Sequence, residues 1–143
     1  MPPVNIEENL AAWARGNPFL TDKLLVDFLD GNDGNCSITT VSHSVLKTYI
    51  DGTAIKEYAF AMQVMFAVSN DSDDKNTDNM FTLRKWQAWI AEQERARNYP
   101  DFGDKCSGFR LENLTSGPGM AMRYENGMAK YQFFAKITYR ERI

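Results

Sequence analysis

The sequence has few of the residues that most often carry catalysis. Among 143 residues there is one histidine, His43, and there are two cysteines, Cys36 and Cys106. A Ser/His/Asp or Cys/His arrangement would have to use His43, whose surroundings, VSHSV, lack a glycine elbow and a carboxylate four residues later. The cysteines are far apart, which favours two buried thiols over a disulfide. We expect no enzyme, no catalytic residue and no cofactor.

Long apolar runs and an excess of basic residues are also missing. Charged or turn residues break every apolar run well before the roughly 20 residues that a membrane helix needs. The first ten residues, MPPVNIEENL, lack the basic flank and apolar stretch of a signal peptide. A net charge of −3 argues against a dedicated nucleic-acid-binding protein. We expect a soluble protein made in a cytoplasm, with no membrane and no specific nucleic acid as partner.

An acidic segment, DSDDKNTD, invites comparison with a calcium loop because Asp71 and Asp73 lie two apart. The rest of the pattern fails. Lys75 stands at the third ligand position, Asn76 where glycine is needed, and Thr82 where a bidentate glutamate is needed. No glycine-rich loop carries the lysine of a phosphate-binding loop either. We expect no metal site.

The chain does have a large apolar fraction and an uneven distribution of charge. Its length, with 43% hydrophobic residues, predicts a single domain over residues 1–143 that buries roughly 70% of its unfolded surface. Residues 1–78 carry 12 acidic and 5 basic side chains, whereas residues 79–143 carry 7 and 11. Copies packed side by side could therefore present unlike charges to each other.

Two long segments show the period of two that is typical of β-strands. From Tyr58 to Val68, one face carries large apolar side chains (Tyr58, Phe60, Met62, Val64, Phe66, Val68) and the other is mostly small. The small face predicts close approach by a helix or by another subunit. In the second segment, one face holds Tyr131, Phe133, Ala135, Ile137 and Tyr139. Asp51-Gly52 precedes the first segment and Asn126-Gly127 the second, and such dipeptides favour hairpin turns.

The remaining pattern predicts helices that cover this sheet. Ile6, Leu10 and Trp13 have helical spacing before Gly16. PFLTDKLLVDFLD indicates a second short helix, although its part from Leu24 to Leu29 also fits a strand. CSITTV, VLKTYI and FRLENL are typical of strands. A central helix is expected from the stripe of Phe81, Leu83, Trp86, Trp89 and Ile90, beginning at Thr77, Asp78 or Asn79 and ending by Tyr99-Pro100.

The expected fold class is therefore α+β: a mainly antiparallel twisted sheet of two long hairpins, with an N-terminal helix and a central helix packed against it. Two segments with few apolar residues, Ser69 to Asn79 and Thr115 to Gly119, are expected to be exposed loops. We take them as a tentative assembly interface, whose residues are Asp71, Asp73, Asp74, Lys75, Asp78, Ser116, Gly117 and Pro118.

The order of these elements, with the Asp51-Gly52 turn, the Tyr58-Phe60 pair and the series of Gly127, Tyr131, Phe133 and Tyr139, resembles a family of small tail proteins. These are the minor capsid or tail terminator (tail completion) proteins of siphophages and of prophages in Firmicutes. The resemblance spans nearly the whole chain and brings no functional residue with it. It implies a structural virion protein of the bacteriophage tail or neck. Such a protein forms a ring of copies, usually six, that caps the tail tube and joins it to the head. Its partners would be the major tail tube protein and head-tail connector proteins.

Three alternatives stay open. A head-tail connector or another neck protein of the same particle has a similar size and α+β build. A small-ligand-binding domain would use the aromatic face of Tyr58, Phe60, Phe66, Tyr131 and Phe133 to line a pocket, although the core is the commoner place for such a stripe. An enzyme that uses His43, such as an acyltransferase, is the third alternative.

Overall fold

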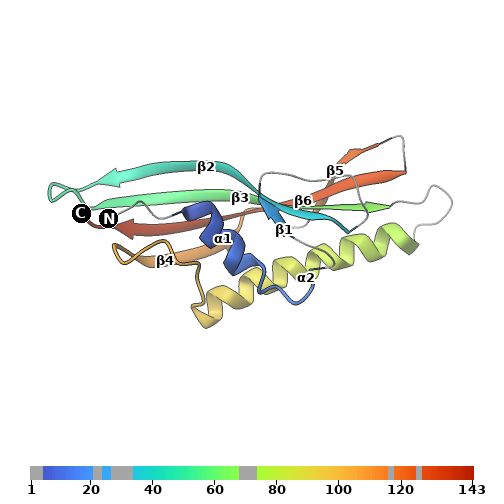
Figure 1. Cartoon of the computed structure of the whole chain (residues 1–143), viewed down its shortest axis with the longest axis horizontal. Coiled ribbons are helices and arrows are strands. Elements are labelled where there is room, and N and C mark those ends of the chain that lie inside the picture. The colour runs from blue at the N-terminus through green and yellow to red at the C-terminus, as the bar shows by residue number, and fades with distance from the viewer. Residues whose placement is uncertain (1–4, 21–23, 27–33, 68–73, 116–117, 125–126) are drawn as a thin grey trace.

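The computed structural model describes residues 5–20, 24–26, 34–67, 74–115, 118–124 and 127–143. The chain forms a long twisted sheet with two helices on one of its faces, which confirms the predicted α+β class (Figure 1). The elements are α1 (Ile6–Ala14), β1 (Leu24–Val26), β2 (Cys36–Thr48), β3 (Ala54–Ala67), α2 (Asp74–Ala96), β4 (Cys106–Asn113), β5 (Gly119–Arg123) and β6 (Met128–Glu141).

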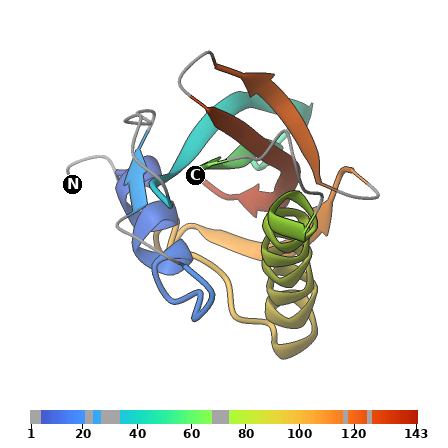
Figure 2. The ribbon, with the colours of Figure 1, turned by 90° about the vertical axis from the view of Figure 1, so that its right-hand side faces the viewer.

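The sheet is mostly antiparallel, as predicted. Its strand order is β1-β2-β3-β6-β4, and β5 also pairs with β6. Only β1 runs parallel to its neighbour, along residues 36–38 of β2. β4 and β5 follow one another along the same edge of β6, against residues 135–141 and 129–132 respectively. The end-on view shows the strong twist between these two strands (Figure 2).

Both predicted hairpins are present, and they turn by the same hydrogen bonds. In the first, the Tyr49 N–H donates to the Thr53 carbonyl at 2.8 Å and the Gly52 N–H donates to the Tyr49 carbonyl at 2.9 Å. In the second, the Tyr124 N–H donates to the Met128 carbonyl at 2.8 Å and the Gly127 N–H to the Tyr124 carbonyl at 3.3 Å. Gly52 and Gly127 have φ values of 89° and 80°, a left-handed conformation that glycine adopts without steric cost. In the first hairpin, residues 50–52 form a three-residue loop that ends in glycine.

The matched faces of β3 and β6 form the centre of the core. In register, Tyr58 lies opposite Ile137, Phe60 opposite Ala135 and Met62 opposite Phe133, and all six are fully buried. Helix α2 contributes Leu83, Trp86 and Ile90 to the same core, and α1 contributes Leu10 and Ala14. The alternation read from the sequence therefore placed the core face correctly on both strands.

Helix α1 is held by polar contacts at each end. The Asn5 side chain accepts a hydrogen bond from the Glu8 N–H at 3.0 Å, which is the usual N-cap interaction. Further along, Asn9 Nδ2 donates to the Asp101 carbonyl at 2.7 Å and Trp13 Nε1 donates to the Asn98 carbonyl at 2.9 Å. These contacts fix α1 to the segment that follows α2.

Three local predictions were wrong or incomplete. Residues 24–26 form a strand and not a helix, because their backbone pairs in parallel with residues 36–38 of β2. CSITTV and VLKTYI belong largely to one continuous strand, β2, in which two bulges absorb extra residues. Helix α2 begins at Asp74, within the predicted loop and three residues before Thr77, the earliest predicted start.

Candidate assembly surface

Of the eight predicted interface residues, the structure describes Asp74, Lys75, Asp78 and Pro118, and none of these four lies in an exposed loop. Asp71, Asp73, Ser116 and Gly117 lie outside the described residues. Asp74 and Lys75 belong to the first turn of α2, and Asp78 is an exposed residue of the same helix. Pro118 is buried, and Gly119 already belongs to β5. Asn79, predicted as loop, is buried and donates from Nδ2 to the Ala67 carbonyl at 3.1 Å, which ties α2 to the end of β3.

The β4 edge of the sheet is closed by side chains of α2. Glu94 Oε2 accepts a hydrogen bond from the Leu111 N–H at 2.8 Å and another from the Tyr99 hydroxyl at 2.8 Å. Gln87 Nε2 donates to the Thr115 carbonyl at 3.1 Å, and Asn113 Nδ2 donates to the Gln87 carbonyl at 3.1 Å. A strand edge normally exposes unpaired backbone groups that attract other strands. Here Glu94 covers the Leu111 N–H of β4 and Gln87 covers the Thr115 carbonyl just beyond the strand, so α2 closes this part of the edge.

The opposite edge, formed by β2, is open along more than half of its length. β1 covers only residues 36–38, and no strand among the described residues pairs with the outer side of residues 41–48. We call residues 41–48 the open edge of β2. Three large apolar side chains stand exposed there, Val41 (53%), Val45 (55%) and Leu46 (55%). Exposed apolar side chains beside free backbone groups are the usual features of a strand-docking site.

Two bulges lie in the open edge. The register between β2 and β3 shifts between Thr40 and Ser42 and again between Val45 and Lys47, so Val41 and Leu46 have no partner residue on β3. Sequence reasoning missed this surface, because apolar residues in a predicted strand are ordinarily assigned to the core. Only the pairing pattern shows that these two lie outside it.

A cluster of polar aromatic side chains joins the open edge to the middle of the sheet. His43 Nε2 lies 2.6 Å from the Tyr139 hydroxyl, and the Thr40 hydroxyl makes a short hydrogen bond with the Tyr58 hydroxyl. Burial and then the positive charge of Lys56 lower the pKa of His43, against the opposing effect of Glu7 and Glu141. Burial raises the pKa of Tyr139, the reverse of what a tyrosine nucleophile needs. The cluster therefore supports a structural role for His43, which joins β2 to β6.

A second polar group lies beside this cluster on the same face. Lys56 Nζ and Glu141 Oε1 form an ion pair at 3.0 Å, and the Cys106 thiol donates to Glu141 Oε2 at 3.6 Å. The hydrogen bond from Lys56 lowers the pKa of Glu141. Burial, followed by the charge of Glu141, raises the pKa of Cys106 to about 11. A thiol in this state is a poor nucleophile.

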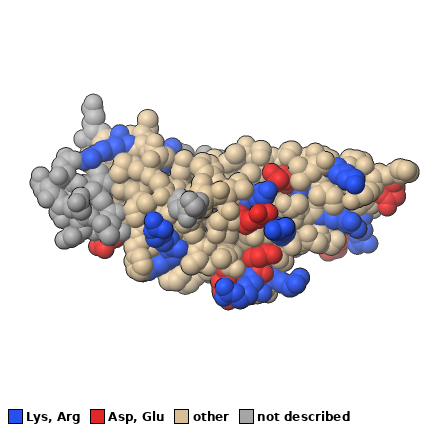
Figure 3. Space-filling view, turned by 180° about the vertical axis from the view of Figure 1, so that it is seen from behind, with Lys and Arg blue, Asp and Glu red and all other residues tan. Residues whose placement is uncertain are grey.

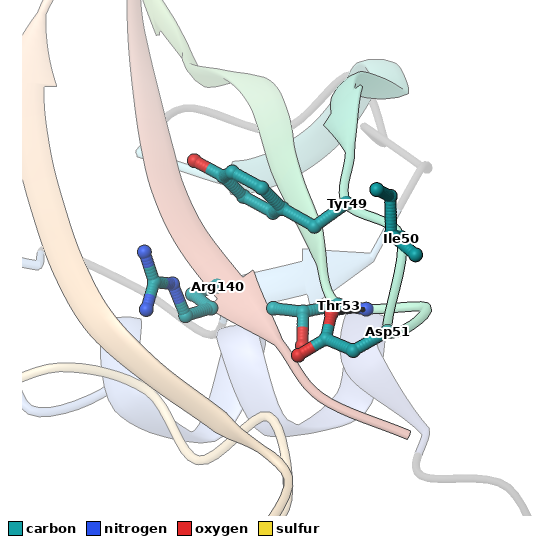
Figure 4. A pocket seen from close by; sticks show the side chains of 5 residues that line it. All are labelled: Tyr49, Ile50, Asp51, Thr53 and Arg140. Atoms are coloured by element: carbon teal, nitrogen blue, oxygen red, sulfur yellow. Dashed lines mark hydrogen bonds between the residues drawn. The ribbon is translucent and has the colours of Figure 1, made fainter.

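The tip of the first hairpin carries an open groove of about 540 Å³, lined by Tyr49, Ile50, Asp51, Thr53 and Arg140 (Figure 4). Two cations lie over the Tyr49 ring: Lys47 Nζ at 4.9 Å and Arg140 Cζ at 5.7 Å from its centroid. The backbone N–H of Thr53 donates to Asp51 Oδ1, and this bond lowers the pKa of the Asp51 carboxyl. The groove is exposed, and its cationic rim lies next to the open edge of β2.

The sheet face that is turned away from the helices carries charged side chains of both signs among uncharged ones (Figure 3). A row of hydrogen bonds crosses it through Thr39, Gln63 and Gln132, with distances of 3.2 and 3.0 Å. Lys136 Nζ lies 3.5 Å from Glu57 and 3.9 Å from Glu112 on the same face. Ala59 and Ala61, from the predicted small-residue face, are buried opposite Lys136 and Phe134 of β6. Neither α1 nor α2 packs on this face, so of the two neighbours expected for it, a helix or another subunit, the second stays a prediction.

The aromatic side chains that a ligand-binding reading would place around a pocket are Tyr58, Phe60, Phe66, Tyr131 and Phe133. All five are buried members of the hydrophobic core. Within the described ranges, no group of three or more His, Cys, Asp or Glu residues is arranged to hold a metal ion. The helices in those ranges are too short or too polar to cross a membrane. No family model matches the chain, and no curated protein matches it.

Proposed function

We propose that the protein is a structural virion protein of the tail terminator type, whose copies form a ring that caps a phage tail tube and joins it to the head. The observation that carries the proposal is the asymmetry of the sheet edges. One edge is closed by Glu94 and Gln87, while the other exposes eight residues of β2 with three apolar side chains. A protein that works alone gains nothing from such an edge and risks aggregation.

The fold supports the same function. The resemblance to tail terminators rested on two hairpins with matched aromatic faces and a helix against them, and this arrangement is present in the described residues. The polar groups with shifted pKa values serve packing, since the Cys106 thiol and the Tyr139 phenol are held in their protonated forms. A neck protein of the same particle, such as a head-tail connector, would share these features.

The proposal is tested on tail tubes. Tubes assembled from a tube protein encoded near this gene are mixed with the purified full-length chain and examined by negative-stain electron microscopy. A terminator produces rings at one end of each tube and stops further tube growth. Rings that bind isolated heads and not tubes would assign the protein to the connector side of the neck. Absence of binding to both particles would overturn the proposal. Genes for a tape-measure protein and a major tail protein immediately downstream would support it independently.

A further inference from the structure

We propose that the open edge of β2 in one copy pairs, antiparallel, with β5 of the next copy, and that this contact builds the ring. The inference rests on the proposed function and names the two surfaces that would join its subunits. The strand that pairs with the open edge of β2 belongs to a second copy of the same chain, because the described part of the sheet has a second edge with exposed apolar side chains.

That second edge is β5. All five of its residues are exposed, and two carry large apolar side chains, Met120 (45%) and Met122 (53%). Among the described strands β5 pairs only with β6. Of the other edge segments, the first part of β2 pairs with β1, and the Leu111 N–H of β4 is bound by Glu94 of α2. β5 and the open edge of β2 are the two described edge segments that expose large apolar side chains.

The directions of the two segments suit a ring. β2, β3, β6 and β5 are each antiparallel to the next, so β2 and β5 run in opposite directions in one subunit. A rotation about the ring axis keeps the inclination and the direction of every strand relative to that axis. β5 of one copy therefore meets β2 of its neighbour antiparallel, which is slightly the more stable pairing. A contact between two different surfaces can close into a ring, whereas pairing of β2 with itself gives a dimer.

The two segments lie at different levels along the sheet, and this offset fits a closed arrangement. Through the registers, Met120 lies level with Tyr131, Val64 and Cys36, while the open edge begins further along β2, at Val41. Pairing with the first half of the open edge offsets neighbouring copies by about six residues, or about 20 Å. The four strands β2, β3, β6 and β5 span about 19 Å across the sheet. An offset of about 20 Å over this width inclines the strands by about 45° to the ring axis. Closed barrels have strand inclinations of about 35–45°.

Charge favours this partner over a second β2. The open edge contains one cation, Lys47, and no acidic residue. Pairing β2 with itself would bring together two edges that each have Lys47 and the neighbouring Arg140. In the β2–β5 arrangement, β2 of one copy carries Lys47 past Gly119 of the next copy and toward the end of that copy's β4. Glu112 lies there, on the same face of the sheet as Lys47. Unlike charges then approach each other across the contact.

The test uses the full-length chain and two single variants, Val45→Lys and Met122→Lys, which each place a charge in one edge only. Sedimentation or light scattering in about 0.15 M salt, up to about 1 mM protein, measures the assembly state. We expect a multimer for the wild type and folded monomers for both variants, with unchanged circular dichroism and a melting temperature that equals that of the wild type only at dilutions where the wild type has dissociated. Phe81→Lys, which alters an exposed apolar residue of α2, is the matched control and should remain a multimer.

Mixing the two variants separates this contact from its alternatives. Each retains one intact edge, so an equimolar mixture should give a one-to-one heterodimer and nothing larger. Ser44→Cys and Ala121→Cys variants should likewise form a disulfide with each other more readily than with themselves. A variant that fails to fold is replaced by Leu46→Lys in β2 or Met120→Lys in β5.

Three outcomes would overturn the inference: a wild-type monomer at every concentration, a multimer that survives both substitutions, or a Met122→Lys variant that stays dimeric. A monomer that nevertheless caps tail tubes would leave the proposed function standing without this contact. A β2–β5 multimer that does not bind tail tubes would support this contact and overturn the proposed function.

Discussion

His43 Nε2 lies 2.6 Å from the Tyr139 hydroxyl, and this hydrogen bond joins two residues that are 96 positions apart in the chain. It links the open edge of β2 to β6, with β3 between them. The His43 ring also packs edge-on against Tyr58, at 5.1 Å between centroids. The open edge is thus held in place by contacts on its inner side while its outer side is left unpaired.

Stability should depend on the protonation of His43. Its pKa is lowered in the folded protein by burial and by Lys56, against Glu7 and Glu141, so the unfolded chain binds the proton more readily. The free energy of unfolding should therefore be highest above a pH of about 6.5 and fall as the pH drops below it. We expect the melting temperature of the wild type to fall more between pH 7.5 and pH 5.5 than that of His43→Gln. Equal pH dependence in the two proteins would show that His43 does not contribute.

Removal of the Glu94 side chain should open the β4 edge. Glu94→Ala leaves the backbone N–H of buried Leu111 and the Tyr99 hydroxyl without this acceptor, at a cost of about 1–3 kcal/mol of unfolding free energy. The variant should also aggregate faster on heating, because an uncovered strand edge pairs with other chains. Glu92→Ala is the matched control: Glu92 is exposed and pairs only with Arg95, so its loss should change stability by about 0.5 kcal/mol at most. Similar urea midpoints for both variants would contradict the capping role.

The Cys106 thiol should react slowly in the native protein. Its pKa of about 11, against 9.0 for an ordinary thiol, lowers the thiolate fraction at pH 8 by about a hundredfold. We expect iodoacetamide to label Cys106 and the buried Cys36 slowly in native protein and rapidly in urea, as followed by peptide mass spectrometry. Labelling of Cys106 at the same rate with and without urea would be inconsistent with its raised pKa.

Duplex DNA should not bind measurably. A terminator ring lies on the path of the genome, and a channel that held phosphates tightly would retard its passage. The net charge of −3 agrees with weak interaction. Fluorescence anisotropy with a labelled duplex at about 0.15 M salt should show no binding at micromolar protein. A submicromolar complex that weakens with added salt would refute this expectation.

The sequence was sufficient to predict the two hairpins and the core face of the sheet. A turn that ends in Asp51-Gly52 or Asn126-Gly127 needs glycine for its positive φ, and the alternation that follows leaves one side of each strand apolar. Both signals are local, so they can be read without knowing the rest of the chain. The stripe of Trp86, Trp89 and Ile90 predicted α2 for the same reason.

The ends and partners of the elements required the tertiary structure. The sequence left Leu24–Val26 open between a helix and a strand, and their pairing beside Cys36 and Ile38 of β2 decides for the strand. The start of α2 at Asp74 could not be predicted either, because the segment around it is polar and has no helical stripe. The contact between Asn79 and the end of β3 joins two segments that a local sequence pattern does not relate.

The open edge of β2 shows most clearly which features the sequence predicts and which depend on the tertiary structure. Sequence reasoning looked for the interface in polar loops, and the four of those residues that the structure describes, Asp74, Lys75, Asp78 and Pro118, lie outside the open edge of β2. Whether a strand edge is open depends on what packs beside it. Glu94 closes β4 because α2 runs along that edge, and nothing in the described structure covers Val45 on β2. The pattern of a strand sets which face is apolar, whereas pairing between distant segments decides which edge stays free.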